Sequence, residues 1–187
     1  CQGLIWVKSS PQQWILDKQD LIRERQHDLA ILAEEEYQKI LIFFSNFIQS
    51  LGESLKLRQQ VIATATVYFK RFYARNSLKC VDPLLLSPTC IFLASKVEEF
   101  GVISNNRLVQ TLKNKFSYAY AQEFPYRFAQ ISECEFYLLE NLDCCLIVYQ
   151  PYRPFSWRIV NDSLRTDVCL LYPPYLIAIS KLRFFQT

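Results

Sequence analysis

The segment from Pro83 to Ser95 restricts the possible folds of this chain most strongly, because it contains no charged side chain. Such a run is too short to cross a bilayer and is typical of a helix enclosed by other helices. Ser87 followed by Pro88 predicts the start of this helix, as an N-cap with proline in the first turn. Gly101 predicts its end. The segment finishes on Lys96, whose ammonium group needs a partner if it is enclosed.

Glycine and turn signals are scarce, which favours helices over strands. The chain has 187 residues and only three glycines. No Asn-Gly or Asp-Gly pair separates alternating apolar segments, so hairpins have little turn chemistry to form from. A hydrophobic content of 51% is enough for a sizeable core. We therefore expect an all-α fold.

Three further helices are predicted in the first half of the chain. Residues 11–32 carry aliphatic side chains at seven-residue spacing beside Trp14 and Leu21, which predicts one amphipathic helix. A second helix over 37–51 follows an acidic run that suits a helix N-terminus, and Gly52 is expected to end it. Residues 58–75 are apolar on almost every side, so we expect that helix to be central. The aliphatic positions of the first helix are Ile15, Ile22 and Leu29.

Two more helices are predicted before residue 145. Residues 105–115 predict a short helix, and residues 125–141 predict a longer one with a single apolar stripe. The five helices after the N-terminal one would form a compact domain that ends near Cys145. The stripe of the longer helix consists of Phe128, Ile131, Cys134, Leu138 and Leu142.

Glu135 is the expected partner of Lys96. On a helical wheel of residues 125–142, Glu133 and Glu140 face outward, but Glu135 falls within the apolar stripe. A carboxylate there is costly unless a partner compensates it, and a charge-assisted bond to Lys96 would compensate both groups. Two interpretations stay open. The pair is either purely structural, or its spare donors and acceptors hold backbone groups of a docked helix.

Composition disfavours several classes of function. The net charge is +3 and the basic residues are spread along the chain, which argues against a general polyanion-binding surface. Seven cysteines without a Cys-x-x-Cys pair predict neither a disulfide framework nor a metal site, and favour a reduced, intracellular protein. No secretory leader or membrane span is predicted, so we expect a soluble protein with no membrane partner and no cofactor. The absence of methionine, even at position 1, suggests a fragment or a variant product.

We expect no catalytic residue. The one histidine lies among charges on the predicted N-terminal helix, and the convergent groups of an acid-base or nucleophilic site are missing from the sequence. A small basic cluster is interpreted as a solvated helix end rather than a nucleic-acid contact, because such contacts need a wider basic face. The cluster consists of Lys70, Arg71, Arg75 and Lys79.

Two segments of the chain align without a gap, "SLKCVDPLLLSP" at 77–88 and "SLRTDVCLLYPP" at 163–174. They share Ser-Leu, a basic residue, Leu-Leu and the final proline. One interpretation is a shared local pattern, and the other is a duplicated helical domain. If the domain is duplicated, the second copy is incomplete, because no room for a helix remains between 149–154 and 157–162.

Four stretches of the chain resemble the cyclins: "ATVYFKRFYARNSL" at 65–78, "PTCIFLASKVEEFG" at 88–101, and the segments 123–154 and 157–175. The match covers roughly residues 10–178 and is strongest for the cyclin of the Mediator kinase module. The resemblance implies a cyclin-box fold with one complete five-helix repeat after an N-terminal helix, and a partial second repeat. The implied divisions are residues 1–34 for the N-terminal segment and helix, 35–145 for the first cyclin box and 146–187 for the partial second box.

The resemblance also implies partners and site residues. The implied partners are the cyclin-dependent kinase of the Mediator kinase module and other Mediator subunits, and the implied setting is RNA polymerase II transcription in the nucleus. Lys96 and Glu99 in "LASKVEE", with Glu135 in "ECEFYLL", would grip the regulatory αC helix of the kinase. The N-terminal helix would lie near the kinase or serve core packing.

A second implied surface lies in "WRIVND". Trp157, Asn161 and Asp162 resemble a surface that faces other Mediator subunits, and a tryptophan beside polar groups suits an interface anchor. The alternative is that Trp157 covers exposed core.

Departures from the family pattern leave other functions open. The segment 105–116 is shorter than in the resembled cyclins, which predicts a clipped or shifted fourth helix. The second repeat lacks its first helix and everything after its third, which would leave apolar side chains without partners and weaken the region locally. The alternatives are a truncated inactive or dominant-negative cyclin and a DNA-binding general transcription factor. The side chains expected to lack partners are Leu170, Leu171, Tyr175 and Ile177.

Overall fold

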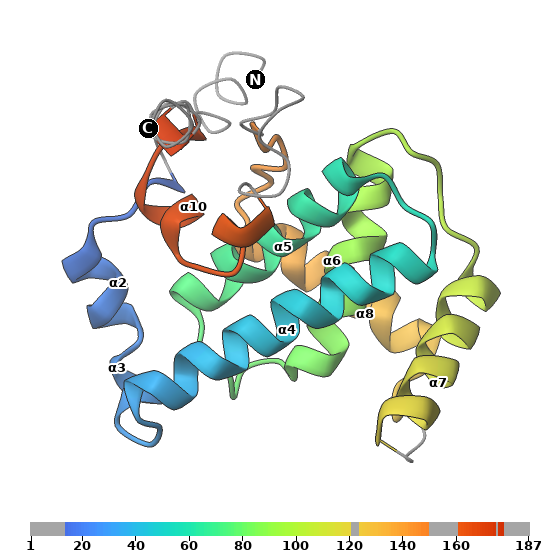
Figure 1. The fold of residues 1–187 in the computed structure, drawn as a ribbon, viewed down its shortest axis with the longest axis horizontal. Helices are drawn as coiled ribbons and strands as arrows, with labels where there is room; N and C mark the ends of the chain where they lie inside the picture. The colour runs from blue at the N-terminus through green and yellow to red at the C-terminus, as the bar shows by residue number, and fades with distance from the viewer. Residues whose placement is uncertain (1–13, 121–123, 150–160, 175, 178–187) are drawn as a thin grey trace, which may run out of the picture.

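The computed structural model describes residues 14–120, 124–149, 161–174 and 176–177. All regular secondary structure in these ranges is helical, and no strand occurs in them. Figure 1 shows a bundle in which long helices cross around one central helix. In chain order the helices are α2 (Lys18–Glu24), α3 (Gln26–Leu29), α4 (Glu34–Ser54), α5 (Gln59–Arg75), α6 (Pro83–Val97), α7 (Asn105–Tyr120), α8 (Phe128–Asn141) and α10 (Val168–Leu171).

Helix α5 is the centre of the bundle, as its apolar sequence predicts. Every residue from Val61 to Ala74 is buried. Helices α4 and α6 pack along it, and α2 and α10 also contact it (Figure 1). A helix covered on all sides can carry apolar residues at every position, and this explains its lack of a polar face.

Helix α6 begins earlier than predicted. Asp82 is the N-cap, its carboxylate accepts a hydrogen bond from the Leu84 amide at 2.9 Å, and Pro83 occupies the first turn. The prediction of a start at Ser87 was wrong, and Pro88 lies inside the helix. The helix also ends before Phe100, because its C-cap is Glu98 and the chain then turns through positive φ at Glu99 and Gly101.

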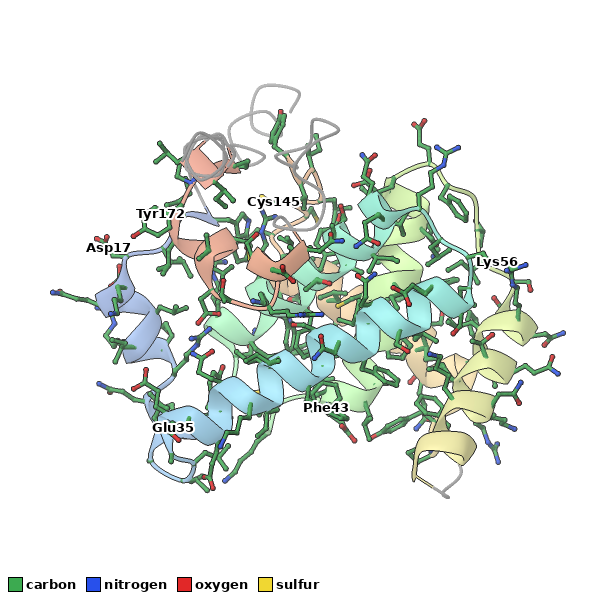
Figure 2. All side chains as sticks on the ribbon, in the orientation of Figure 1. Asp17, Glu35, Phe43, Lys56, Cys145 and Tyr172 are labelled. Carbon is green, nitrogen blue, oxygen red and sulfur yellow. The ribbon has the colours of Figure 1, made fainter. Side chains whose placement is uncertain are left out.

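Helix α4 is longer at both ends than the predicted 37–51. It begins with the acidic run, where a glutamate at the third position accepts a hydrogen bond from the Ala33 amide at 3.1 Å. Figure 2 shows Glu35 in this first turn. Negative charge there is favourable because the helix dipole leaves unpaired amides at the N-terminus. The prediction that Gly52 ends the helix was wrong, because α4 continues to Ser54.

The N-terminal region is two short helices instead of one. Within residues 14–32, α2 and α3 are separated at Arg25, and residues 11–13 lie outside the described part. Of the predicted aliphatic positions, Ile22 is 46% exposed, whereas Leu29 packs against the core. Trp14 and Leu21, which the pattern places beside these positions, are buried, and so is Asp28.

Helices α7 and α8 complete the domain. Helix α7 starts at Asn105 as predicted and runs to Tyr120, five residues beyond the predicted end at Lys115. Helix α8 starts at Phe128, three residues later than the predicted Pro125. Its predicted stripe is confirmed: all but the partly buried first member are buried in the main core, at Ile131, Cys134, Leu138 and Leu142.

The C-terminal segment finds apolar partners on the first helices. Leu170 is fully buried in a cluster with Leu21 and Ala74, and the Leu16 amide donates a hydrogen bond to the Leu170 carbonyl at 2.8 Å. Ile177 is also buried. The expectation that these side chains lack partners was therefore wrong for both residues. Leu171 is half-buried against the same cluster, and Tyr175 lies outside the described residues.

The two aligned segments share local geometry. The Cys80 amide donates to the Ser77 carbonyl at 3.0 Å, and at the aligned position the Thr166 amide donates to the Ser163 carbonyl at 3.1 Å. Each turn is followed by a helix, α6 or α10. Beyond this turn the segments differ, because α10 ends at Leu171.

Candidate functional site

Lys96 and Glu135 form an ion pair between α6 and α8. The ammonium nitrogen of Lys96 donates to both carboxylate oxygens of Glu135, at 2.8 and 2.7 Å. Lys96 lies in the last turn of α6, and Glu135 lies in the middle of α8, which packs against α6. The sequence-based pairing of these two residues is confirmed.

The two charged groups differ in their access to solvent. The Glu135 side chain is 8% exposed, whereas the Lys96 side chain is 36% exposed. A buried carboxylate with both oxygens on one ammonium group holds that group in a fixed place. An ammonium has three N–H donors, and Glu135 takes two of them, so one donor remains for another molecule. The accessible end of the pair is therefore the lysine.

Two aromatic rings pack next to Lys96. The Lys96 nitrogen lies 4.0 Å from the centroid of the Phe92 ring. That ring packs edge-on against Phe128 at the start of α8, with centroids 5.4 Å apart. Phe92 precedes Lys96 by four residues, so one helical turn stacks the two side chains. The sequence analysis did not identify Phe92, although this spacing on α6 could have indicated it.

The two glutamates after Lys96 have different surroundings. The Glu98 carboxylate accepts hydrogen bonds from Gln60 and Thr64 of α5, both at 2.6 Å, and so ties the end of α6 to the central helix. Glu99 is exposed, in the loop after α6, with φ of 51°. Its amide donates to the Lys96 carbonyl at 3.3 Å. Glu99 thus follows Lys96 by three residues in the sequence, and its side chain is exposed to solvent.

Exposed aromatic side chains follow Glu135 on α8. Phe136 is 72% exposed and Tyr137 is 41% exposed. The Tyr137 ring packs edge-on against Phe72 of α5, with centroids 5.9 Å apart. A fixed charged pair together with exposed aromatic side chains on the same helix is suited to binding a protein surface.

The residues of the second predicted surface are only partly described. Trp157 lies outside the described residues. The Asn161 amide oxygen accepts a hydrogen bond from Gln59 of α5 at 3.0 Å, and exposed Asp162 pairs with Arg165 at 3.4 Å. Both residues line a polar hollow between the C-terminal segment and α4.

The predicted basic cluster is not a solvated surface. Lys70 is 1% exposed and Arg71 is 8% exposed. Lys70 donates to the Thr166 carbonyl, and Arg71 donates to the Cys145 carbonyl at 3.1 Å. Burial lowers the pKa of both groups. The interpretation as a solvated helix end was wrong for these two residues and is confirmed for exposed Arg75 and Lys79.

The other residue types that often take part in catalysis or metal binding are histidine and cysteine. His27 is exposed on α3. Cys80, Cys90, Cys134, Cys144 and Cys169 carry free thiols, and no group of three His, Cys, Asp or Glu side chains in the described ranges could hold a metal. No described helix is both long and apolar enough to cross a bilayer.

Comparisons with known proteins place this architecture in a family. Residues 8–147 match the model of the cyclin N-terminal domain. The cyclin-C of Drosophila melanogaster is 72% identical over 201 residues, covering 97% of this chain and 75% of that protein. The cyclin-C of Rattus norvegicus is 61% identical over 198 residues, covering 95% of this chain and 69% of that protein.

Solved structures with the same fold include chains of the TFIIK and CAK complexes. One chain of the yeast TFIIK complex superposes with a TM-score of 0.70 at 25% identity, covering 94% of this chain and 83% of that chain. One chain of the CAK complex from Chaetomium thermophilum gives a TM-score of 0.76 at 19% identity, covering 98% and 69%, and this likeness concerns the fold. With a matching family model over most of its length and curated relatives of high identity, this chain belongs to the cyclin family.

Proposed function

We propose that this cyclin is the activating subunit of a transcriptional cyclin-dependent kinase in the Mediator kinase module, and that it acts in the nucleus on RNA polymerase II transcription. Its high identity to cyclin-C of fly and rat supports this assignment. One solved structure that shares its fold is a chain of the yeast RNA Pol II CTD kinase CTDK-1 complex. We keep the division into a first cyclin box at 35–145 and a partial second box at 146–187 as part of the proposal.

The observation that carries the proposal is the Lys96–Glu135 pair. Lys96 presents a spare N–H donor at the surface while Glu135 and Phe92 fix its position. A backbone carbonyl at the end of a kinase helix is a suitable acceptor for that donor. Exposed Glu99 can take a backbone amide or a basic side chain of the same helix. The three residues together would bind αC of the kinase.

Activation then follows from the preference of this surface for one kinase conformation. Phosphoryl transfer needs a lysine of the kinase paired with a glutamate of αC, and a metal-binding aspartate in place. A cyclin that binds αC in its inward position favours that state in proportion to the difference in affinity between the two states. Cyclins are regulatory subunits, so the kinase supplies the catalytic groups.

A second contact of this cyclin is proposed for other Mediator subunits. Asn161 and Asp162 line a polar hollow beside α4, and Asp162 is exposed. The hollow offers both amide and carboxylate groups to a partner. Trp157 precedes these residues in the sequence and is proposed as part of the same contact.

The alternative functions have less support than the kinase-activating function. Two of the four basic residues that suggested DNA binding are buried, which leaves a smaller exposed cluster. The truncated inactive or dominant-negative cyclin was suggested by the helices missing from the second repeat, and the local weakness expected from that loss is opposed by the burial of Leu170 and Ile177. Neither alternative is favoured by a specific contact of the described residues.

Kinase binding by paired variants tests the proposal. Lys96→Ala and Glu135→Ala should each weaken association with the kinase by ~2 kcal/mol or more, because each removes part of a charged interface centre. At a cyclin concentration that saturates the kinase, the variants should reach the kinase activity of the parent, because the substitutions change the affinity for the kinase and leave the bound state intact. Glu133→Ala, on the exposed face of the same helix, is the matched control and should bind as the parent does.

A second variant separates binding from folding. Replacing the pair with apolar residues of similar volume, Lys96→Met with Glu135→Leu, leaves no unpaired buried charge and should keep the thermal stability of the chain. We expect this double variant to fold normally and to lose kinase binding. Normal binding by the double variant, measured by calorimetric titration, would show that the pair serves the fold alone.

A further inference from the structure

Basic side chains gather at the turn between α4 and α5. Lys56 and Arg58 belong to this turn and are exposed, and Arg107 is exposed in the first turn of α7. Arg107 donates a hydrogen bond to the Leu55 carbonyl at 2.8 Å, which places the start of α7 against the turn. Figure 2 shows Lys56 on this side of the molecule, next to α7. Cations from two segments that lie 52 residues apart in the sequence therefore share one surface.

Two apolar side chains from the loop after α6 border these cations. The Arg58 guanidinium lies 5.8 Å from the centroid of the Phe100 ring, and that residue is 36% exposed. Val102 follows two residues later and is 71% exposed, whereas the next residue, Ile103, is buried and anchors the loop. We call this surface the corner patch. It consists of Lys56, Arg58, Phe100, Val102 and Arg107.

The cations of the corner patch form no ion pair with any residue that the structure describes. Two acidic side chains of the same segments are hydrogen-bonded to other groups. Glu53 accepts from Gln49 at 2.8 Å, and Glu98 accepts from Gln60 and Thr64, both at 2.6 Å. The positive charge of the patch thus stays available to a partner with negative charge.

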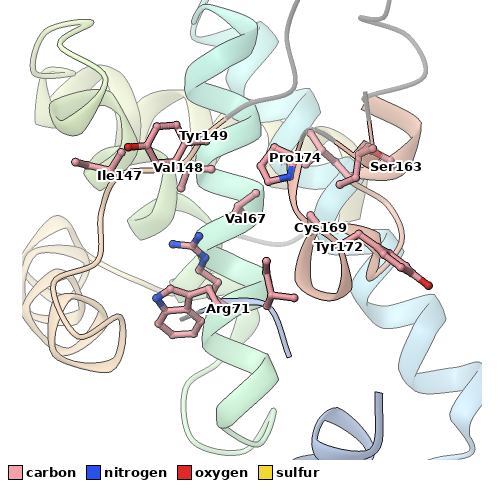
Figure 3. Close-up of a pocket in the computed structure, with 13 residues that line it drawn as sticks. Val67, Arg71, Ile147, Val148, Tyr149, Ser163, Cys169, Tyr172 and Pro174 are labelled. Carbon is pink, nitrogen blue, oxygen red and sulfur yellow. The ribbon is translucent and has the colours of Figure 1, made fainter. Parts of the chain in front are cut away.

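The arginines of the corner patch differ from an arginine in the middle of α5. Figure 3 shows Arg71 on that helix, one turn after Val67. Arg71 is 8% exposed and donates to the Cys145 carbonyl at 3.1 Å, so its guanidinium is used inside the protein. Arg58 and Arg107 are exposed instead.

Both exposed arginines are already held in place. Arg58 lies over the Phe100 ring, and Arg107 uses one N–H donor on the Leu55 carbonyl. A guanidinium has five N–H donors, so each arginine keeps an edge that can bind a carboxylate through two parallel hydrogen bonds. A side chain that is held before binding loses less conformational entropy when a partner arrives.

We propose that the corner patch binds an acidic peptide segment that carries apolar side chains among its carboxylates. The carboxylates would pair with Arg58 and Arg107, and Lys56 would add attraction at longer range. The apolar side chains would cover Phe100 and Val102, which a purely electrostatic partner would leave exposed. A nucleic acid fits less well, because binding to its phosphate backbone needs more cations over a wider face.

The corner patch is separate from the residues proposed to bind the kinase. Its apolar part begins directly after Glu99, but Lys96, Glu99 and Glu135 do not belong to it. Peptide binding here needs no kinase, so it can be tested on the chain alone. An acidic segment of a substrate held at the patch would be concentrated beside the kinase, and this consequence, unlike the binding itself, rests on the proposed function.

Titration of two fluorescently labelled peptides with the full chain tests the proposal. The acidic peptide is "GDDFDELDG", and its neutral counterpart is "GNNFNQLNG". At low ionic strength, fluorescence anisotropy should give a dissociation constant on the order of 0.1 mM for the acidic peptide. The neutral peptide should bind at least roughly tenfold more weakly, and added salt should weaken the acidic one. Equal binding of the two peptides, or no binding of the acidic peptide, would overturn the proposal.

A double variant locates the binding on the patch. Arg58→Gln with Arg107→Gln should weaken the acidic peptide by roughly tenfold or more, because both carboxylate partners are lost. Lys39→Gln with Arg127→Gln is the matched control, since it removes the same charge from two other exposed positions. The control should bind within about twofold of the parent. An equal loss in both double variants would show attraction to net charge alone and contradict the site.

Two milder variants keep the test decisive should the double variant lose stability. Lys56→Asn removes one charge and suits the backbone, because asparagine tolerates the φ of 55° at this position. Val102→Ser should weaken "GDDFDELDG" but leave the weaker binding of "GDDSDESDG" unchanged. Parent-like affinity for "GDDFDELDG" in both variants would contradict the proposal. A short single-stranded DNA that binds more tightly than the peptide and displaces it would show a nucleic-acid surface instead.

Discussion

Gly52 allows the two longest helices to approach closely. A Cβ atom added at this position would lie 2.5 Å from Cγ1 and 2.7 Å from Cδ1 of Ile62, closer than real side chains come. Glycine in a helix interior costs roughly 1 kcal/mol relative to alanine. Here the packing of α4 against α5 at this point offsets the cost. The role of Gly52 is close packing, and the end of α4 comes later, at Ser54.

Gly52→Ala should destabilise the chain by about 2 kcal/mol, because the new methyl group overlaps the Ile62 side chain. Denaturant unfolding measures the change, with an unchanged slope if the folded state keeps its compactness. Ile62→Ala removes both overlapping carbon atoms, so Gly52→Ala should cost much less in that background. Additive effects of the two substitutions would contradict the overlap.

At the scale of elements, α6 depends on its first turn. Asp82 caps the helix by accepting from the Leu84 amide, and its other oxygen accepts from the Tyr126 hydroxyl, ahead of α8. Pro83 fits the first turn because its missing N–H is not needed there. Pro88 lies inside the helix and has no N–H to donate a helical hydrogen bond. On either side of it, the Ser87 hydroxyl donates to the Pro83 carbonyl at 2.6 Å and the Thr89 hydroxyl donates to the Leu85 carbonyl at 2.7 Å. The position of Lys96 at the far end depends on this helix.

Asp82→Ala should therefore lower the free energy of unfolding by ~1–2 kcal/mol, the usual range for loss of a capping side chain. Asp82→Asn keeps an acceptor and should retain most of the stability. Asp17→Ala is a matched control, because Asp17 is the N-cap of α2 without a side-chain capping bond. Thermal unfolding of the three variants compares them, and an equal loss for Asp17→Ala would contradict the special role of Asp82.

Across the whole molecule, a buried ion pair joins the two ends of the described chain. The Arg25 guanidinium donates to the Asp167 carboxylate at 2.6 and 3.2 Å, and Gln38 of α4 donates to the same carboxylate at 3.3 Å. Arg25 separates α2 from α3, and Asp167 precedes α10. Burial alone would raise the pKa of Asp167, but the hydrogen bond and charge of Arg25 outweigh it and lower that pKa.

The lowered pKa sets the direction of the pH dependence. Because the folded pKa is below the unfolded value of about 3.9, the contribution of Asp167 is complete above that value and is lost as the pH falls through the folded pKa. At pH 7, Asp167→Asn should cost about 3 kcal/mol, since it leaves Arg25 buried without its carboxylate. The gap between parent and variant should narrow below pH ~4.

Unfolding free energies measured from pH 7 down to pH 2 check this expectation. Asp162→Asn serves as the control, because Asp162 belongs to an exposed pair with Arg165. Exposed pairs contribute little, so the control should change stability by less than about 1 kcal/mol at every pH. A gap for Asp167→Asn that stays constant below pH 4 would contradict the assigned pKa shift.

The fold class and the central pair could be predicted because both depend on patterns within single helices. A segment apolar on all sides must be enclosed, so residues 58–75 predicted the central helix. Glu135 interrupts an apolar stripe, and such a carboxylate needs a nearby cation. Lys96 was the available one at the end of the other enclosed segment, and the two groups meet at 2.7 Å.

The sequence by itself thus determined the all-α class, the central element and the ion pair, all of which follow from local periodicity and from the cost of a buried charge. Only the tertiary structure decided that the side chains of Lys70, Arg71 and Arg25 are buried. These side chains look like ordinary surface charges in the chain, and they are buried against parts of the chain that lie 96, 74 and 142 residues away in the sequence. Contacts over that separation leave no periodic signal, since the partner is a backbone carbonyl or a single aspartate that any loop could supply.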